Sequence, residues 1–249
     1  EKGEERNVDL KLGNNSNLGE IGFEIKTDKA EKLMLTLSVD GTDYHNCWPI
    51  WIYPSKVVIN NEKVVMTESF REAKEALDEG ETVLLNPNYK SLDGIDGRFV
   101  PVFWSPVHFP NQPSTMGLLM DENHAAFTHF PTSKFTEWQW WDLCIQSRSI
   151  NIDSVDVTPI IRVIDNFVTN HHLSNVFETK VGKGKLIFSS IDLTSNLDAR
   201  PVARQLRSSL LSYMVSDEFK PTGSVALDEL DFFDEEAKKQ FQDLDIYQD

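Results

Sequence analysis

The chain has 249 residues, enough for one large domain or two smaller ones with a substantial hydrophobic core. Hydrophobic residues make up 40% and charged residues 26%, which excludes collagen-like, wholly disordered and coiled-coil proteins. The 24 Lys and Arg against 40 Asp and Glu give a net charge of −16. We expect no nucleic-acid partner, because binding to phosphates requires clustered basic residues. No apolar run approaches the ~18–20 residues of a membrane span, so no membrane-spanning helix is predicted.

Half of the net charge lies at the C-terminal end. Residues 217–249 hold eleven acidic residues and three lysines, a net of −8. We predict residues 220–249 to be an acidic tail, either a solvated cover or a final helix that packs its apolar side chains onto the domain. Those side chains are Leu230, Phe232, Phe233, Phe241 and Leu244. At the other end no basic-then-apolar stretch follows Glu1, so any export signal is expected to be already missing.

Residues 1–54 have the pattern of short β-strands. Apolar residues alternate or cluster in four stretches that are separated by polar turn residues, and these are residues 8–12, 21–25, 33–39 and 48–53. Fewer than 55 residues is short for a complete β-sandwich of about 100 residues. The pattern therefore predicts a small β-sandwich-like segment or the last strands of a larger one.

Residues 55–219 have a different pattern, typical of an α/β domain. Ser69 and Glu72 have the spacing of a capping box, which predicts a helix that starts after Ser69 and ends at Gly80. Short apolar runs precede this helix and residues 82–85 follow it as a buried strand. A strand, a helix and a strand within about 30 residues predict a βαβ unit with parallel strands.

The rest of this domain continues in the same way. Strands are predicted at residues 149–152, 160–164, 174–180 and 185–189, a short helix at 123–130, and an amphipathic helix at 200–215. The last two strands flank Gly182 and Gly184, as in a hairpin. The predicted fold class is α/β, with a mixed or parallel sheet that has helices on both faces.

Motifs for catalysis, phosphate binding and metal binding are missing. The chain has no G-x-G-x-x-G, G-x-x-x-x-G-K-[ST] or G-x-S-x-G sequence. Cys144 lacks the small flanking residues of a nucleophile elbow, and His124 and His129 are not spaced as a helical zinc pair. We therefore predict no catalytic residue, no metal site and no cofactor.

Dense aromatic loops are the most informative feature. Six tryptophans are present, and loops at 103–110 and 135–142 hold four of them. Sugar rings stack on exposed aromatic faces while carboxylates and amides bind hydroxyl groups. The candidate ligand-binding residues are Trp104, Glu137, Trp138, Gln139, Trp140, Trp141 and Asp142. The alternative is that these rings are buried in the core or at a domain interface, as large aromatic residues often are.

Several long runs resemble a known family. Residues 41–54 contain Asn46-Cys47-Trp48-Pro49-Ile50-Trp51-Ile52-Tyr53-Pro54, which is similar to the last strands of an immunoglobulin-like domain in Bacteroidetes-type glycoside hydrolases of family 2. Six further stretches resemble the C-terminal region of those β-galactosidase-like enzymes, and these are residues 101–106, 129–132, 138–143, 159–167, 181–186 and 200–207. The resemblance covers roughly residues 8–219.

The resemblance implies an accessory role. In that family two glutamates of a separate TIM barrel cleave the sugar, and such a barrel needs ~250 residues of its own. The resembled C-terminal region has a class I glutamine amidotransferase-like fold, but the G-x-C-x-G motif of that class is absent here. The resemblance thus implies a non-catalytic C-terminal module for packing, oligomerisation or substrate positioning. The implied partners are a glycoside hydrolase catalytic domain or sibling subunits, and the implied location is extracytoplasmic, in the periplasm or at the cell surface.

Two other functions stay open at this point. The chain is a carbohydrate-binding module if the tryptophan loops are exposed, with polysaccharide as its partner. It is an independent hydrolase or amidotransferase-like enzyme if Cys144 lies within hydrogen-bond reach of His129, or if an acid in a cleft has a strongly shifted pKa.

Overall fold

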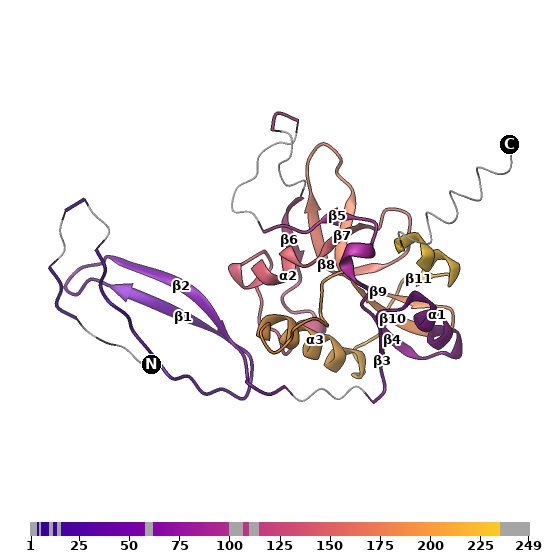
Figure 1. Ribbon diagram of the computed structural model, residues 1–249, viewed down its shortest axis with the longest axis horizontal. Helices are drawn as coiled ribbons and strands as arrows, with labels where there is room; N and C mark the ends of the chain where they lie inside the picture. Colours follow the sequence, from indigo (N-terminus) through magenta and orange to yellow (C-terminus); the bar gives the residue numbers. More distant parts are fainter. Residues whose placement is uncertain are drawn as a thin grey trace.

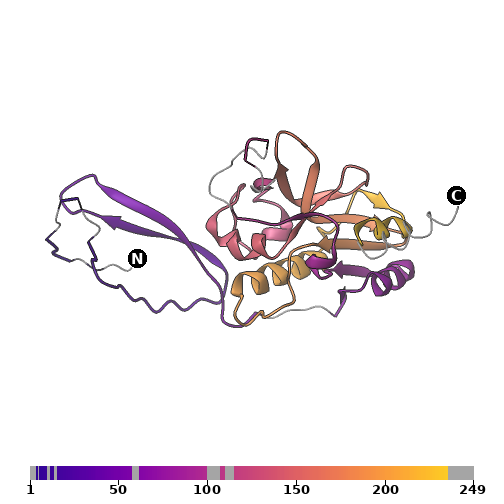
Figure 2. The same cartoon turned by 45° about the horizontal axis from the view of Figure 1, so that its top comes forward.

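A computed structural model describes residues 4, 6–9, 12–13, 16–57, 62–99, 107–109 and 115–234. Figure 1 shows an N-terminal β-hairpin that projects from a larger α/β body. Figure 2 shows the same hairpin as an arm that stands away from the body, with the extended residues that precede it running back along its length.

The arm consists of β1 (Glu31–Ser38) and β2 (His45–Ile52), which pair antiparallel with Glu31 opposite Ile52. Within the described part of residues 1–54, these are the strands of one two-stranded sheet. The predicted strand at 21–25 is wrong, since these residues form coil. Strand 8–12 lies partly outside the described residues. The predicted β-sandwich-like segment is thus a hairpin here, because isolated apolar alternation forms no strand without a partner strand.

The body is a mixed sheet whose described strands number nine. They are β3 (Val65–Thr67), β4 (Thr82–Leu85), β5 (Ile95–Asp96), β6 (Thr115–Met120), β7 (Arg148–Asn151), β8 (Thr158–Asp165), β9 (His172–Val181), β10 (Gly184–Ser189) and β11 (Ser224–Val225). The main path runs β3-β4-β10-β9-β7-β5, while β8 and β11 also pair with β9, and β6 pairs with β8. β3, β4 and β10 are mutually parallel, and β9 is antiparallel to β10, β8 and β7. This confirms an α/β fold with a mixed sheet.

The helical elements vary in length. They are α1 (Phe70–Glu79), η1 (Tyr89–Ser91), η2 (Ala125–Phe127), η3 (Trp138–Trp140), α2 (Trp141–Ile145), α3 (Pro201–Met214) and η4 (Asp228–Phe233). The predicted start of α1 is confirmed, because the Ser69 side chain accepts a hydrogen bond from the Glu72 backbone N–H, and Gly80 ends the helix in the left-handed conformation with φ 91°. The predicted helix at 123–130 is a single 3₁₀ turn.

Helices cover both faces of the sheet, as predicted. Alternate residues of β4 point to opposite faces, so Leu84 packs in the cluster with α3 while Val83 and Leu85 pack in the cluster with α1. Leu230 and Phe233 of η4 are also buried on the α1 face. Packing of Leu230 and Phe233 onto the domain is therefore confirmed, but Phe232, which was expected to pack with them, is 43% exposed. The predicted helix that includes Phe241 and Leu244 lies outside the described residues.

Candidate functional site

The base of the arm and the loop before α2 are joined by a reciprocal pair of indole hydrogen bonds. Trp51 of β2 donates from Nε1 to the Pro131 carbonyl oxygen at 3.1 Å, and Trp138 donates from Nε1 to the Pro49 carbonyl oxygen at 2.8 Å. The two indoles meet edge to face with centroids 5.9 Å apart and an interplanar angle of 76°. These contacts hold the two indole rings against each other, although the two residues are far apart in the chain.

Two polar contacts strengthen the same junction. The Tyr53 hydroxyl donates to Gln139 Oε1 at 2.8 Å. Lys32 of β1 places its ammonium 2.8 Å from the Glu137 carboxylate and 5.3 Å from the Trp51 ring centroid. The arm is thus attached at its base by aromatic and polar side chains.

A cleft of about 370 Å³ opens at this junction, and we call it the aromatic groove. It is lined by Trp51, Tyr53, Trp138, Gln139, Trp141, Asp142 and Val202. Trp138 is 56% exposed and Trp141 is 55% exposed, so both present ring surface to solvent. Its volume lies within the range of small-molecule sites, which is about 300–1,000 Å³.

The structure brings together four of the seven residues predicted for ligand binding. Trp138, Gln139, Trp141 and Asp142 all line the aromatic groove. The groove also has two aromatic walls that were not assigned to a site from the sequence, Trp51 and Tyr53. Both residues lie at the aromatic-rich end of β2 or directly after it, but this pattern alone does not indicate which loop packs against them.

Two of the other predicted residues have different roles, and a third lies outside the described residues. Trp140 is 0% exposed, packs edge to face on Phe130 at 5.3 Å and donates to the Thr132 hydroxyl at 3.0 Å. Its expected ligand contact is therefore wrong, since it is a core residue. Glu137 binds Lys32 at the junction. Trp104 is the one outside the described residues.

Asp142 is held by protein groups rather than left available to a ligand. Its carboxylate accepts hydrogen bonds from Arg200 Nε at 2.9 and 3.2 Å and from Gln146 Nε2 at 2.6 Å. Arg200 lies just before α3, its side chain is 8% exposed, and its NH1 donates to the Ser195 carbonyl at 3.1 Å. Asp142 thus anchors the wall of the groove, and the tryptophans supply the exposed surface.

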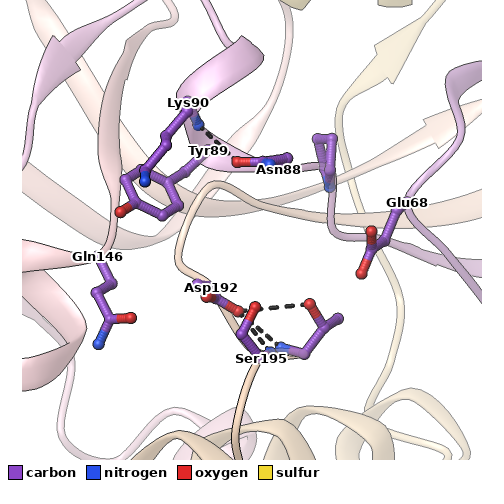
Figure 3. A pocket seen from close by; sticks show the side chains of 9 residues that line it. Glu68, Asn88, Tyr89, Lys90, Gln146, Asp192 and Ser195 are labelled. Carbon is purple, nitrogen blue, oxygen red and sulfur yellow. Dashed lines mark hydrogen bonds between the residues drawn. The ribbon is translucent and has the colours of Figure 1, made fainter.

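A second cleft, of about 310 Å³, lies where the parallel strands β3, β4 and β10 end, and we call it the carboxyl-edge pocket (Figure 3). It is lined by Glu68, Pro87, Asn88, Tyr89, Lys90, Gln146, Asp192, Thr194 and Ser195. These residues follow the carboxyl ends of the three strands, with Gln146 added from the end of α2. Ligands of open α/β sheets bind at this edge, because the loops there converge.

Asp192 is the most constrained group of the carboxyl-edge pocket. Its Oδ1 accepts from the backbone N–H groups of Thr194 and Ser195 at 3.0 and 2.8 Å, and its Oδ2 lies 3.5 Å from Arg200 NH1. Burial alone raises the pKa of Asp192, but these backbone donors and the guanidinium outweigh it and lower the pKa below its ordinary value. Asp192 is therefore an ionised residue that shapes the loop after β10.

The chemistry expected of a nucleophile is not favoured at Cys144. Burial raises the pKa of this thiol to about 12, which disfavours the reactive thiolate. Among the described residues, no hydrogen bond joins Cys144 to His129, and no group of three or more His, Cys, Asp or Glu residues stands where it would hold a metal ion. Over the same residues, no helix combines the length and apolar character needed to cross a bilayer.

The fold defines the class as a mixed α/β domain with a β-hairpin arm. Residues 64–233 match a family model described as "Domain of unknown function (DUF8487)", and residues 1–54 match one described as "Domain of unknown function (DUF8488)". The first match spans more than half of the chain, so the protein belongs to the DUF8487 family. No curated protein matches the sequence.

Proposed function

We propose that this chain is a non-catalytic accessory module of a secreted glycoside hydrolase, and that it positions carbohydrate at the aromatic groove. The observation that carries the proposal is the meeting of Trp51, Tyr53, Trp138 and Trp141 in one open cleft. The sequence resemblance to the C-terminal region of family 2 glycoside hydrolases supports the same class of parent enzyme.

The aromatic groove has the chemistry of a carbohydrate platform. An aromatic ring offers a broad apolar face to the C–H groups of a sugar ring at low cost in side-chain entropy. Trp141 is over half exposed and is the first residue of α2, while Trp138 is fixed by its hydrogen bond to the Pro49 carbonyl oxygen. A platform of two half-exposed indoles, one of them fixed by a hydrogen bond, favours a ligand with extended apolar faces over a compact ion.

The accessory role is supported by the surface of the arm. Both faces of the β1–β2 hairpin carry exposed apolar side chains, since neighbouring residues of a strand point to opposite sides. The exposed apolar or aromatic side chains of the arm are Met34, Leu35, Leu37, Val39, Tyr44 and Trp48. An exposed apolar surface of this kind is typical of a protein interface. We propose that further β-structure of an immunoglobulin-like domain, or a sibling subunit, covers it.

The proposal also covers the fold relationship of the body and the location of the protein. The β3–α1–β4 unit with β10 parallel to β4 is compatible with a glutamine amidotransferase-like arrangement, and we propose this relationship for the body. An extracytoplasmic location follows from the resemblance alone. An independent hydrolase that uses Cys144 is less favoured, because burial keeps this thiol in its neutral form.

The proposal is tested by titrating the chain with a panel of plant and host polysaccharides and their oligosaccharides. Binding is followed by intrinsic tryptophan fluorescence and repeated by calorimetry. We expect a saturable signal for one glycan class, since two exposed indoles line the groove. A folded protein that gives no saturable signal with any glycan would overturn the carbohydrate-positioning role and leave packing as the function of the junction.

A further inference from the structure

The carboxyl-edge pocket is formed by three loops that leave parallel strands side by side. Glu68 follows β3, Asn88, Tyr89 and Lys90 follow β4, and Asp192 follows β10. In Figure 3 Glu68 and Gln146 lie on opposite sides of the cleft, with Asp192 and Ser195 between them. The pocket is separate from the aromatic groove, because no residue lines both.

Some polar groups of this pocket are already engaged by the protein. Asp192 caps the backbone of its own loop and faces Arg200. Asn88 Oδ1 accepts from the Lys90 backbone N–H at 3.0 Å. Gln146 Nε2 donates to Asp142 at 2.6 Å. These bonds fix the side chains and determine which of their atoms still face the cleft.

The remaining groups are a balanced set of donors and acceptors. Asn88 keeps its Nδ2 donor and Gln146 keeps its Oε1 acceptor, since their other amide atoms are bonded as described. Among the described residues, the Glu68 carboxylate and the Lys90 ammonium have no ion-pair partner. The Lys90 ammonium instead lies 5.7 Å from the Tyr89 ring centroid. The cleft thus offers donors, acceptors and one aromatic ring.

The charges of the lining argue against a simple ionic ligand. The lining carries one ammonium, of Lys90, and two carboxylates, of Glu68 and Asp192, so neither an anion nor a cation finds a lining of purely opposite charge. A hydroxyl group both donates and accepts a hydrogen bond, so a ligand with several hydroxyls satisfies both kinds of group at once. Its apolar ring face has a surface to pack against in Tyr89.

We propose that the carboxyl-edge pocket binds a small, neutral, polyhydroxylated ligand, such as a monosaccharide or a cyclitol. The volume of about 310 Å³ lies at the lower end of small-molecule sites and suits a single ring. This inference goes beyond the proposed function, because it concerns a second site whose ligand class follows from its own lining. The two sites use different residues and can fail independently.

The test is ligand-observed NMR and calorimetry on the full chain, with D-glucose, D-galactose, D-mannose and myo-inositol as neutral probes. Galacturonate, glucosamine and glycine serve as charged and zwitterionic comparators. We expect saturable binding of at least one neutral probe, with an affinity that changes less than twofold when the salt concentration is raised. Exposed charges are screened by salt, whereas hydrogen bonds to neutral hydroxyls are much less so.

Two variants locate the site, and both are checked for folding by thermal unfolding. Tyr89→Ala removes the ring face and Glu68→Ala removes an exposed acceptor, so each should weaken neutral-probe binding at least tenfold. The matched controls are Tyr44→Ala on the arm and Glu79→Ala at the end of α1, which should bind as the wild type does. Glu68 is exposed, so its variant stays informative if Tyr89→Ala does not fold.

Three results would overturn this inference. One is the absence of saturable binding by every neutral probe. Another is preferential binding of a charged or zwitterionic comparator. The third is wild-type affinity in both Tyr89→Ala and Glu68→Ala. The additional variant Trp141→Ala separates the two proposals, since it should leave monosaccharide binding here unchanged while it removes binding at the aromatic groove.

Discussion

Trp140 and Trp141 are adjacent in the chain, yet one indole is completely buried and the other is 55% exposed. The division falls where the 3₁₀ helix η3 ends and α2 begins. Trp140 packs against Phe130 in the core, whereas Trp141 lines the aromatic groove. This pair of residues therefore contains one indole that stabilises the body and one that lines an open cleft.

The first prediction is that these two tryptophans differ sharply in their effect on stability. Trp140→Ala should lower the free energy of unfolding by about 3–5 kcal/mol, because it deletes a fully buried ring and leaves a cavity. Trp141→Ala should change it by less than about 1 kcal/mol, as expected of a half-exposed side chain. Urea unfolding followed by circular dichroism measures both. Equal losses in the two variants would contradict the assignment of Trp140 to the core.

The second prediction concerns the two thiols and pH. Cys47 is exposed and should react with a thiol reagent in the native protein, whereas Cys144 should react only after unfolding. Burial raises the pKa of Cys144 to about 12, above its unfolded value of about 8.5. At pH 7 the thiol is neutral in both the folded and the unfolded state, so it does not affect stability. As the pH rises from about 8.5 towards 12, the thiol ionises in the unfolded state but stays neutral in the folded state, and the free energy of unfolding falls.

The measurement counts reactive thiols at pH 8 with and without denaturant, with Cys47→Ser as the control that should show none in the native state. Unfolding curves at pH 7.5 and 10.5 then compare the wild type with Cys144→Ala. The wild type should lose more stability over this interval than the variant does. Rapid labelling of Cys144 in the folded protein would show that the thiol is accessible and refute the prediction.

The third prediction tests the support of the groove wall by Asp142. Arg200 is largely buried and, within the part of the chain that the structure describes, its NH2 has no hydrogen-bond partner, so the Asp142 carboxylate is its main compensation. Asp142→Ala should lower the free energy of unfolding by about 1.5–3 kcal/mol, the range for a hydrogen bond to a charged group. Asp198→Ala, at an exposed position nearby, is the matched control. Stability equal to that of the control would mean that Asp192 alone compensates Arg200.

The fourth prediction is that the arm opens more readily than the body. β1 and β2 form a two-stranded sheet with exposed apolar faces, which is marginal when isolated, whereas β9 is hydrogen-bonded on both edges. Amides of β1 and β2 should exchange with deuterium at least tenfold faster than amides of β9. Hydrogen-exchange mass spectrometry resolves the two regions. Equal protection would indicate that the arm is covered in solution, as in a dimer.

Local patterns predicted the body of this fold better than its site. The spacing of Ser69, Glu72 and Gly80 is sufficient for α1, because caps depend on neighbouring residues. The partner of Trp138 lies about 90 residues earlier in β2, and no local pattern encodes that contact. The choice between Trp140 and Trp141 likewise depends on where Phe130 lies, which is tertiary packing. The sequence therefore identified the tryptophan loop, but not which of its rings are available.

The carboxyl-edge pocket was not predicted from the sequence for the same reason. Apart from Gln146 at the end of α2, its residues come from loops after β3, β4 and β10, and only the order of the strands in the sheet brings those loops together. None of them belongs to a known phosphate or nucleophile motif. The signal that was available is the parallel β3–α1–β4 unit, which fixes the edge where such a pocket opens.

The most direct test of the carbohydrate-positioning role is a calorimetric comparison of wild type, Trp141→Ala and Phe135→Ala with the glycan that the panel selects. Phe135 is 61% exposed and lies outside the aromatic groove, so it controls for the loss of an exposed ring. We predict that Trp141→Ala weakens binding at least tenfold and that Phe135→Ala binds as the wild type does. Wild-type affinity in Trp141→Ala, or equal losses in the two variants, would contradict a ligand site at the aromatic groove.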